Sequence, residues 1–233
     1  KAMKYVLMVS VPATLGIAVI AKSFIVAIYG PAYEIGMIPL YALSLIIFIM
    51  PVGSIFGSLL KSKERVKTLS RIIIYSLLLN IVLNFVFIKY LPVWFNKGPE
   101  FAILGAGIAT VISRGYFLVM RYNKVKKELG IKPKFTNLGK YLISGILMSV
   151  FLISFVYAFD MNIILGGINI LLGIGIYFGF LYGLGGLDKE DIDLFRGIFN
   201  EKMGKMFNFN NKKESVYNEK DESEHKNPEK QTN

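Results

Sequence analysis

The sequence has 233 residues, of which 54% are hydrophobic and 14% aromatic, and its formal net charge is +11. It has no cysteine and one histidine, His225, so disulfides and thiolate or histidine-rich metal sites are excluded, and no metal or cofactor is expected. Apolar residues gather in long runs with the charges between them, which is typical of an integral membrane protein and not of a soluble domain.

Six apolar runs are each long enough for the helix of about 20 residues that crosses a bilayer. In chain order they cover residues 5–21 (or 5–29), 37–60, 72–91, 102–121, 141–159 and 163–184. The link between the last two is so short that these helices must form an antiparallel hairpin. The sequence therefore predicts an all-α bundle of six transmembrane helices within residues 1–187.

The loop charges predict the orientation. The segment 61–71 carries five Lys/Arg and one Glu, and the segment 121–140 carries seven Lys/Arg and one Glu. Basic loops stay in the cytoplasm, and these two fall at alternate links. We therefore expect a multi-pass protein of the cell membrane with both ends cytoplasmic. Because topology and anionic lipid explain this charge, nucleic acid is not expected as a partner.

Residues after the sixth run predict two further segments. Asp188 is placed to cap a helix, and apolar residues recur at three- and four-residue spacing from Ile192 to Met206. Residues 188–207 are therefore expected to form an amphipathic helix, either on the inner leaflet or packed under the bundle. Residues 208–233 lack apolar residues to bury and are expected to be a disordered cytoplasmic tail.

The third run carries Ser76, Asn80 and Asn84 at four-residue spacing, so they share one face of a helix. Amides in hydrocarbon need hydrogen-bond partners. One interpretation is bonding between helices, and the other is the wall of a hydrophilic cavity in which Asn80 and Asn84 bind substrate. The sequence leaves both open.

Glycines at four-residue spacing predict close helix packing. The second run has Gly53 and Gly57, with Pro51 expected to kink that helix as Pro12 kinks the first. The sixth run has a longer series, which consists of Gly175, Gly179 and Gly183.

Arg114 is the sharpest feature of the fourth run, because it lies about 10 Å from the cytoplasmic end of that helix. Its side chain is expected to lean away from the nearer interface. An arginine near the bilayer centre costs at least about 2.5 kcal/mol, so it should face a cavity or an anion. No Asp or Glu lies within any of the six runs to pair with it. We interpret Arg114 as a candidate substrate-binding residue, with pairing to a backbone carbonyl or a carboxylate from elsewhere as the structural alternative.

The stretch that contains Gly105 and Gly107 superficially suggests a nucleotide-binding loop. It lacks the preceding strand and the third glycine, which argues against that site. The series from "NIVLNFVFIKYLP" to "LGAGIATVIS", together with "IVAIYGPAY", instead resembles the polysaccharide transporter branch of the multidrug/oligosaccharidyl-lipid/polysaccharide exporter superfamily, which contains flippases of lipid-linked oligosaccharides. The matching residues are Asn80, Asn84, Pro92, Gly105, Ala106, Gly107, Ala109 and Thr110.

This resemblance implies that Gly105 and Gly107 let the fourth helix start close against the third. It also implies a transporter, not an enzyme, that moves a polyprenyl-pyrophosphate-linked glycan from the cytoplasmic to the outer leaflet by alternating access. Family members have twelve to fourteen spans, so six spans correspond to a C-terminal half. The expected partners are therefore the bilayer, a lipid-linked glycan and a further N-terminal half of six or more helices.

Three other functions remain open. A cation-coupled exporter of the same superfamily usually needs a carboxylate inside the membrane, and the six runs have none. A scaffold for glycan-synthesis enzymes would use the basic loops and the acidic tail. An enzyme would need paired acidic or histidine residues near the membrane, and no such pair is recognisable.

Overall fold

The computed structural model describes residues 1–193 and residue 197, apart from residues 97, 99, 132, 134, 160 and 161. The chain divides into two compact units, Lys1–Gly186 and Leu187–Asn233. The helices of the first unit, in chain order, are α1 (Ala2–Tyr29), the short 3-10 helix η1 (Pro31–Gly36), α2 (Met37–Ser62), α3 (Val66–Trp94), α4 (Glu100–Leu129), α5 (Leu138–Ala158) and α6 (Ile163–Gly183).

The predicted all-α fold with six spans is confirmed. Six helices among the described residues are long and apolar enough to cross a membrane, and that part of the chain contains no strand. The helices extend beyond the apolar runs, since α3 begins at Val66 and α4 continues eight residues past Arg121. Lys, Arg and Glu favour helix, so the charged segments continue the helices instead of forming loops.

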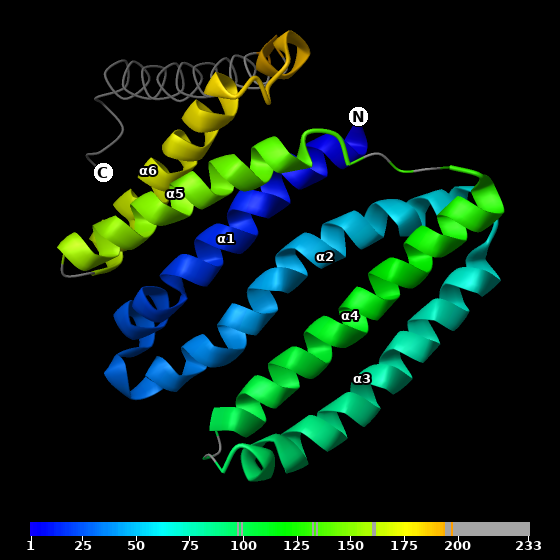
Figure 1. Ribbon diagram of the computed structural model, residues 1–233, viewed down its shortest axis with the longest axis horizontal. Coiled ribbons are helices and arrows are strands. Elements are labelled where there is room, and N and C mark those ends of the chain that lie inside the picture. Colours follow the sequence, from blue (N-terminus) through cyan, green and yellow to red (C-terminus); the bar gives the residue numbers. More distant parts are fainter. Residues whose placement is uncertain are drawn as a thin grey trace, which may run out of the picture. The chain divides into compact units, whose positions relative to one another are not determined.

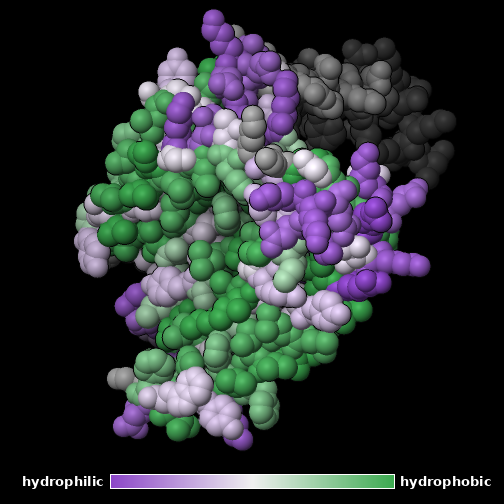
Figure 2. All heavy atoms as spheres, turned by 45° about the vertical axis from the view of Figure 1, so that its right-hand side comes forward, coloured by the Kyte–Doolittle hydropathy of each residue, from purple (hydrophilic) through white to green (hydrophobic). Residues whose placement is uncertain are grey.

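Most apolar side chains of the first unit face outwards. Between 11% and 28% of the most apolar window of each span is buried, which is far too little for a bundle in water. Figure 2 shows apolar side chains over the flanks of the helices and hydrophilic side chains gathered towards helix ends. This distribution fits helices whose outer surface is covered by lipid.

The six long helices pack as two groups of three. Helices α1, α5 and α6 contact one another, α4 lies against both α2 and α3, and α1 and α2 join the two groups (Figure 1). Helices α5 and α6 form the predicted hairpin. The Asn162 side chain caps α6 by accepting a hydrogen bond of 2.8 Å from the Leu165 backbone N–H.

Two glycines in the first half of α4 lie close to neighbouring helices. A Cβ placed on Gly105 would lie 2.9 Å from the backbone oxygen of Phe87 in α3, and one on Gly107 would lie 3.0 Å from the Cβ of Ala42 in α2. Both glycines therefore lie inside a continuous helix and make room for other helices. No strand precedes them in the described chain, so a nucleotide loop is ruled out.

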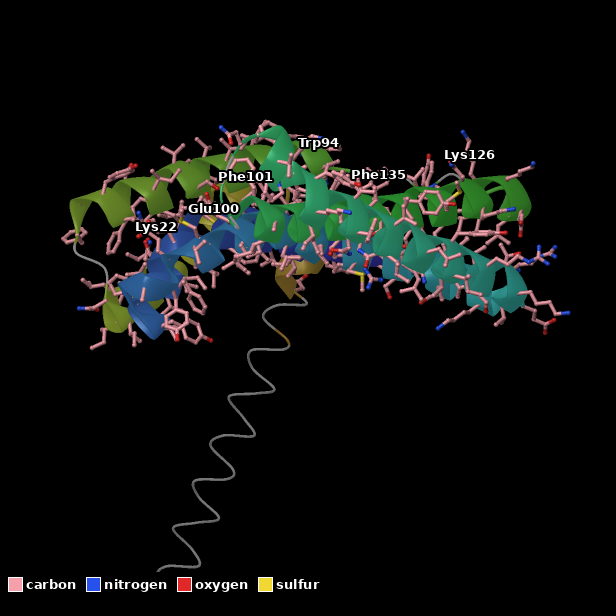
Figure 3. All side chains as sticks on the ribbon, turned by 90° about the horizontal axis from the view of Figure 1, so that it is seen from below. Lys22, Trp94, Glu100, Phe101, Lys126 and Phe135 are labelled. Atoms are coloured by element: carbon pink, nitrogen blue, oxygen red, sulfur yellow. The ribbon has the colours of Figure 1, made fainter. Side chains whose placement is uncertain are left out.

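The two ends of α4 differ in character. Figure 3 shows Phe101 and Trp94 near one end of α4 and Lys126 near the other. At the first end Tyr90 and Trp94 stack with ring centroids 6.0 Å apart. An aromatic end opposite a basic end is the pattern of a helix that crosses between two membrane interfaces.

Glycines of α5 and α6 fall into two sets. A Cβ on Gly145 would lie 2.7 Å from Leu15, and one on Gly173 would lie 2.8 Å from Leu152, so a larger residue at either position would push that leucine side chain aside. The predicted packing series behaves differently, because a Cβ would meet no described atom within 4 Å at Gly175, Gly179 or Gly183. These three glycines face away from the rest of the first unit, and their packing against another helix stays a prediction.

The second unit is described for only a few residues. Residues 189–193 are helical, and the Asp191 carboxylate accepts a hydrogen bond of 2.8 Å from the backbone N–H of Asp188. A carboxylate three residues into a helix that binds back to the N-cap is half of a capping box, so a helix does begin at Asp188. The rest of the predicted amphipathic helix and the predicted disordered tail lie outside the described residues, except Gly197.

Candidate functional site

The polar stripe of α3 lies against α4. The Ser76 hydroxyl donates to the backbone oxygen of Ser113 at 2.8 Å, and the Asn80 Nδ2 donates to the Ser113 Oγ at 2.9 Å. The Asn84 Nδ2 donates in turn to the backbone oxygen of Asn80 at 2.9 Å and to its Oδ1 at 3.1 Å. Ser113 is buried, and its hydroxyl donates a hydrogen bond to the backbone oxygen of Ala109. The stripe is thus a connected hydrogen-bond network between two helices.

This network favours the helix-bonding interpretation of the stripe. Each amide finds a protein partner, as hydrocarbon surroundings require, and such contacts are worth about 0.6–2 kcal/mol each. Asn80 and Asn84 are nevertheless only partly buried, so one edge of the network is open. Substrate binding by the two asparagines remains a proposal.

Arg114 lies next to Ser113 but on a different face of α4. Positions 107, 114, 118 and 121 share one face of a helix. Three of them touch α2, because Gly107 lies against Ala42 and both Leu118 and Arg121 lie against Gly53. The side chain of Arg114 is exposed, although α2 covers that face on either side of it. In the described part of the chain it makes no hydrogen bond and no ion pair.

Arg121 is a buried arginine that the sequence analysis missed. Its side chain keeps 9% exposure, and its Nη1 donates a hydrogen bond of 2.7 Å to the backbone oxygen of Gly53 in α2. The guanidinium carbon lies 3.6 Å from the centroid of the Phe117 ring, which is a cation–π contact. Its Nε is buried with no hydrogen-bond partner in the described chain.

The space for this guanidinium comes from Gly57. A Cβ there would lie 2.7 Å from Nη1 and 3.0 Å from Cζ of Arg121. Gly57 of α2 therefore makes room for an arginine side chain of α4, and Gly53 supplies the backbone oxygen that this side chain binds. The sequence did contain this signal, since Phe117 and Arg121 are one helical turn apart on α4. The apolar run that predicts this span ends at Arg121, so the sequence alone indicates an arginine that reaches water.

Three ion pairs of the first unit lie near the helix ends. Glu128 lies 3.2 Å from Lys124 and 3.8 Å from Arg65, and Lys22 lies 2.6 Å from Glu34. Among the described residues no three His, Asp or Glu side chains are grouped to hold a metal ion. Arg114 is therefore a cation of the central part of α4 whose charge the described bundle does not neutralise.

Taken together, the geometry places two polar features at the same level of α4. The network through Ser113 faces α3, and Arg114 follows it in the sequence on an adjacent face. Asn80 and Asn84 lie together, whereas Arg114 shares no contact with them in the described structure. An exposed guanidinium and a partly open row of amides can each bind hydrogen-bond acceptors, and the guanidinium in particular suits an anionic group.

Comparison with known proteins agrees with this description at a coarse level. No protein-family model matches the chain. Over 171 residues, or 73% of its length, the chain is 26% identical to the "Probable low-salt glycan biosynthesis flippase Agl15" of Haloferax volcanii. The match covers 33% of that protein, so the chain spans about a third of its length. Six apolar helices and this distant likeness fit a multi-pass membrane protein with a transporter role.

Proposed function

We propose that this chain is part of a flippase that moves lipid-linked glycan precursors from the cytoplasmic to the outer leaflet by alternating access. The observation that carries the proposal is Arg114, a cation in the central part of a membrane-spanning helix that is exposed and unpaired in the described bundle. The similarity to a protein named as a probable glycan biosynthesis flippase supports the same function.

The physical reason is the cost of a charge in hydrocarbon. A guanidinium that faced lipid at this depth would be unstable, so an aqueous or anionic partner is needed. A diphosphate group between a polyprenyl chain and a glycan supplies such a partner, and guanidinium groups bind phosphate oxygens through paired hydrogen bonds. Arg121 cannot serve in this state, because the oxygen of Gly53 and the Phe117 ring already hold it.

The proposal also includes the orientation of the chain in the membrane and a further set of helices that would complete the site. Basic residues at the α2–α3 and α4–α5 links favour a cytoplasmic location of those links and of both ends of the chain, in the cell membrane. The exposed side of Arg114 is open to a further set of helices, so the substrate cavity would be completed by an additional half of the transporter. This partner is part of the proposal.

The test is transport by variants of Arg114. The protein that carries this chain is reconstituted in proteoliposomes, and movement of a labelled polyprenyl-pyrophosphate oligosaccharide is measured. Arg114→Met removes the charge and keeps a long side chain, so insertion should be as good or better while transport falls sharply. Arg114→Lys should retain part of the transport, because the charge remains without the paired hydrogen bonds.

Arg71→Met is the matched control. Arg71 is also an exposed arginine on a membrane-spanning helix, but it lies near the end of α3 that joins α2. Its loss should leave transport close to that of the unchanged protein. Undiminished transport by the Arg114→Met variant would remove the main support for the proposal, and failure of that variant to fold would make Arg114 a structural residue.

A further inference from the structure

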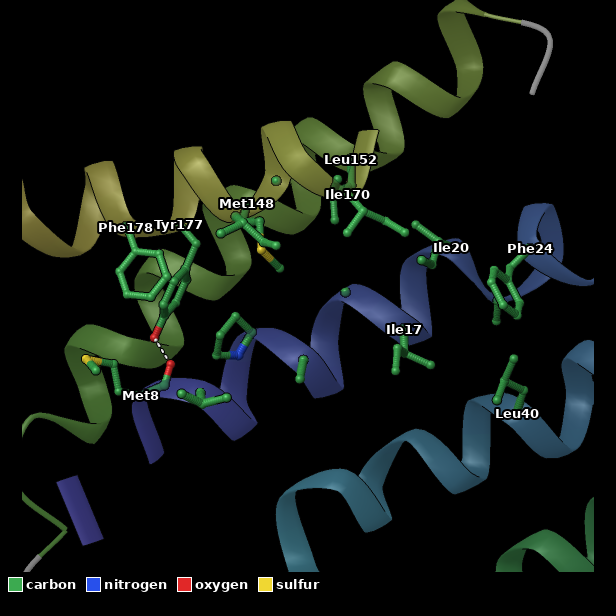
Figure 4. Close-up of a pocket in the computed structure, with 17 residues that line it drawn as sticks. Met8, Ile17, Ile20, Phe24, Leu40, Met148, Leu152, Ile170, Tyr177 and Phe178 are labelled. Atoms are coloured by element: carbon green, nitrogen blue, oxygen red, sulfur yellow. Dashed lines mark hydrogen bonds between the residues drawn. The ribbon is translucent and has the colours of Figure 1, made fainter. Parts of the chain in front are cut away.

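An apolar cavity of about 580 Å³ runs along α1, on the opposite group of helices from Arg114. Helices α5 and α6 form one wall, and Leu40 of α2 borders it on the other side (Figure 4). Met8 and Tyr177 lie at one end of it and Phe24 at the other, as Figure 4 shows.

A smaller cavity of about 170 Å³ continues this one along the same helix. The two share Ile20, Phe24 and Ile170, and the second extends to Ile28. From Met8 to Ile28 the lining of α1 covers 21 residues, and the rise between these two residues is about 30 Å. This length equals the thickness of the hydrocarbon core of a bilayer, about 30 Å. We call the two cavities together the α1 groove.

The lining of the α1 groove has almost no polar group to offer. The Tyr177 hydroxyl is the polar side-chain group of the larger cavity, and it is used, because it donates a hydrogen bond of 2.9 Å to the backbone oxygen of Met8. Ser23 and Asn162 belong to the smaller cavity only. Such a lining cannot bind an ion, a glycan or a phosphate, and it suits a hydrocarbon chain.

Small residues give the groove its width. Pro12, Ala13 and Gly16 line it on α1, and Gly173 lines it on α6. A Cβ on Gly16 would meet only the Met148 methyl group, at 3.7 Å, so this position opens towards the groove. Met8 and Met148 add flexible side chains that adapt to an irregular apolar ligand.

We propose that the α1 groove holds the polyisoprenoid chain of a lipid-linked substrate, an inference that rests on the function proposed above. The length of the groove favours a single long hydrocarbon chain. One acyl chain of an ordinary phospholipid reaches only to the middle of the bilayer, or about 15 Å, so two lipids from opposite leaflets would be needed to fill the groove. A long polyprenyl chain fills a groove that runs through both leaflets. The groove thus recognises the tail, while the cation on α4 recognises the head.

The test is photolabelling of the protein that carries this chain, in lipid nanodiscs and without any transport step. The probe is a long-chain polyprenyl phosphate with a diazirine on an inner isoprene unit, and a phosphatidylcholine with a diazirine on its acyl chain is the comparison. Labelled positions are mapped by mass spectrometry. We expect the polyprenyl probe to label peptides that contain residues 8–24 and 170–178, and an excess of unlabelled polyprenyl phosphate to compete.

Two glycine substitutions provide a matched pair. Gly16→Leu places a side chain in the groove, whereas Gly175→Leu places the same side chain on α6 where a Cβ meets nothing within 4 Å. Both remove a glycine from a helix, so their effects on helix stability are alike. Gly16→Leu should lower groove labelling by roughly tenfold, because several methylene groups lose their place, and Gly175→Leu should not. Ala13→Leu is a second filling variant should Gly16→Leu fail to fold.

The outcomes separate the inference from the proposed function. Labelling that both filling variants leave unchanged overturns the groove proposal, as does absence of labelling. Equal labelling by the phosphatidylcholine probe without competition by polyprenyl phosphate also overturns it, since the groove then holds ordinary lipid. The two proposals can also fail separately. If Gly16→Leu removes the groove labelling but the Arg114→Met variant transports normally, the groove proposal is supported and the proposed role of Arg114 is wrong.

Discussion

The slot that Gly57 provides for Arg121 leads to a quantitative prediction. In Gly57→Ala the new methyl group would lie 2.7 Å from Nη1 of Arg121, so the guanidinium must shift, and we expect it to move out of its site. The variant then loses the 2.7 Å hydrogen bond to the Gly53 oxygen and the contact with the Phe117 ring. A hydrogen bond from a charged group is worth about 1.5–3 kcal/mol, and replacing glycine by alanine in a helix returns about 0.5–1 kcal/mol.

The net expectation is therefore that Gly57→Ala lowers the free energy of unfolding by about 1–2 kcal/mol. Gly53→Ala is the matched control on the same helix. Its Cβ would lie 3.7 Å from Leu118 and 4.0 Å from Nη1 of Arg121, which are ordinary contacts. This variant should be as stable as the unchanged protein or slightly more stable.

Unfolding in mixed detergent micelles, followed by circular dichroism, measures the difference between the two variants. The background Arg121→Met sharpens the comparison, because the guanidinium that alanine displaces is then absent. In that background the cost of Gly57→Ala should largely disappear, which a double-mutant cycle detects as a coupling energy. Equal stability of Gly57→Ala and Gly53→Ala, or no coupling with Arg121, would refute the reasoning.

Two further predictions follow from the α3–α4 network and from the loop charges. Asn80→Leu removes the 2.9 Å hydrogen bond to the Ser113 hydroxyl and also a hydrogen-bond partner of Asn84. It should therefore destabilise the bundle by about 1–2 kcal/mol in the same unfolding assay. Ile81→Leu, on the exposed neighbouring face, is the control and should leave the stability unchanged. Single cysteines that replace Ser62, Asn96 and Asn137 should report the topology. Only the cysteine at position 96 should react with an impermeant maleimide in intact cells, and the reverse pattern would show that the predicted orientation is wrong.

The sequence predicted the number, type and approximate position of the spans because hydrocarbon imposes a simple rule. A run of apolar residues long enough to cross the bilayer must be helical, since no other local structure satisfies its backbone groups. The ends were less well predicted, as in α3 and α4, because helices continue into water when their residues favour helix. The pairing of helices depends on side-chain shape and was visible only where glycines marked a close approach, as at Gly105.

The candidate site was predicted in part. The asparagine stripe was read correctly as one face of a helix, but its partner Ser113 was not identified, because a single serine in an apolar run carries no signal of its own. Depth within the apolar run points to Arg114 and not to Arg121, although the structure buries Arg121 and exposes Arg114. Depth along one helix says nothing about which neighbouring helix lies beside a side chain, and that neighbour decides whether an arginine is satisfied.

The two arginines of α4 are best understood together. They lie two helical turns apart, on the same face, and α2 passes that face. Arg121 is fixed to the backbone of α2, and this bond ties the two helices together just beyond the exposed Arg114. The bond from Arg121 to α2 fixes the position of α4, and so it also fixes the position of Arg114. The hydrogen-bond donors of Arg114 then remain available for an anionic group of a substrate. The α1 groove lies on the other three-helix group, and α1 and α2 join the groups. A ligand with an anionic head and a long apolar tail has one chemical group suited to the cation and one suited to the α1 groove, so the two proposals concern the same class of substrate.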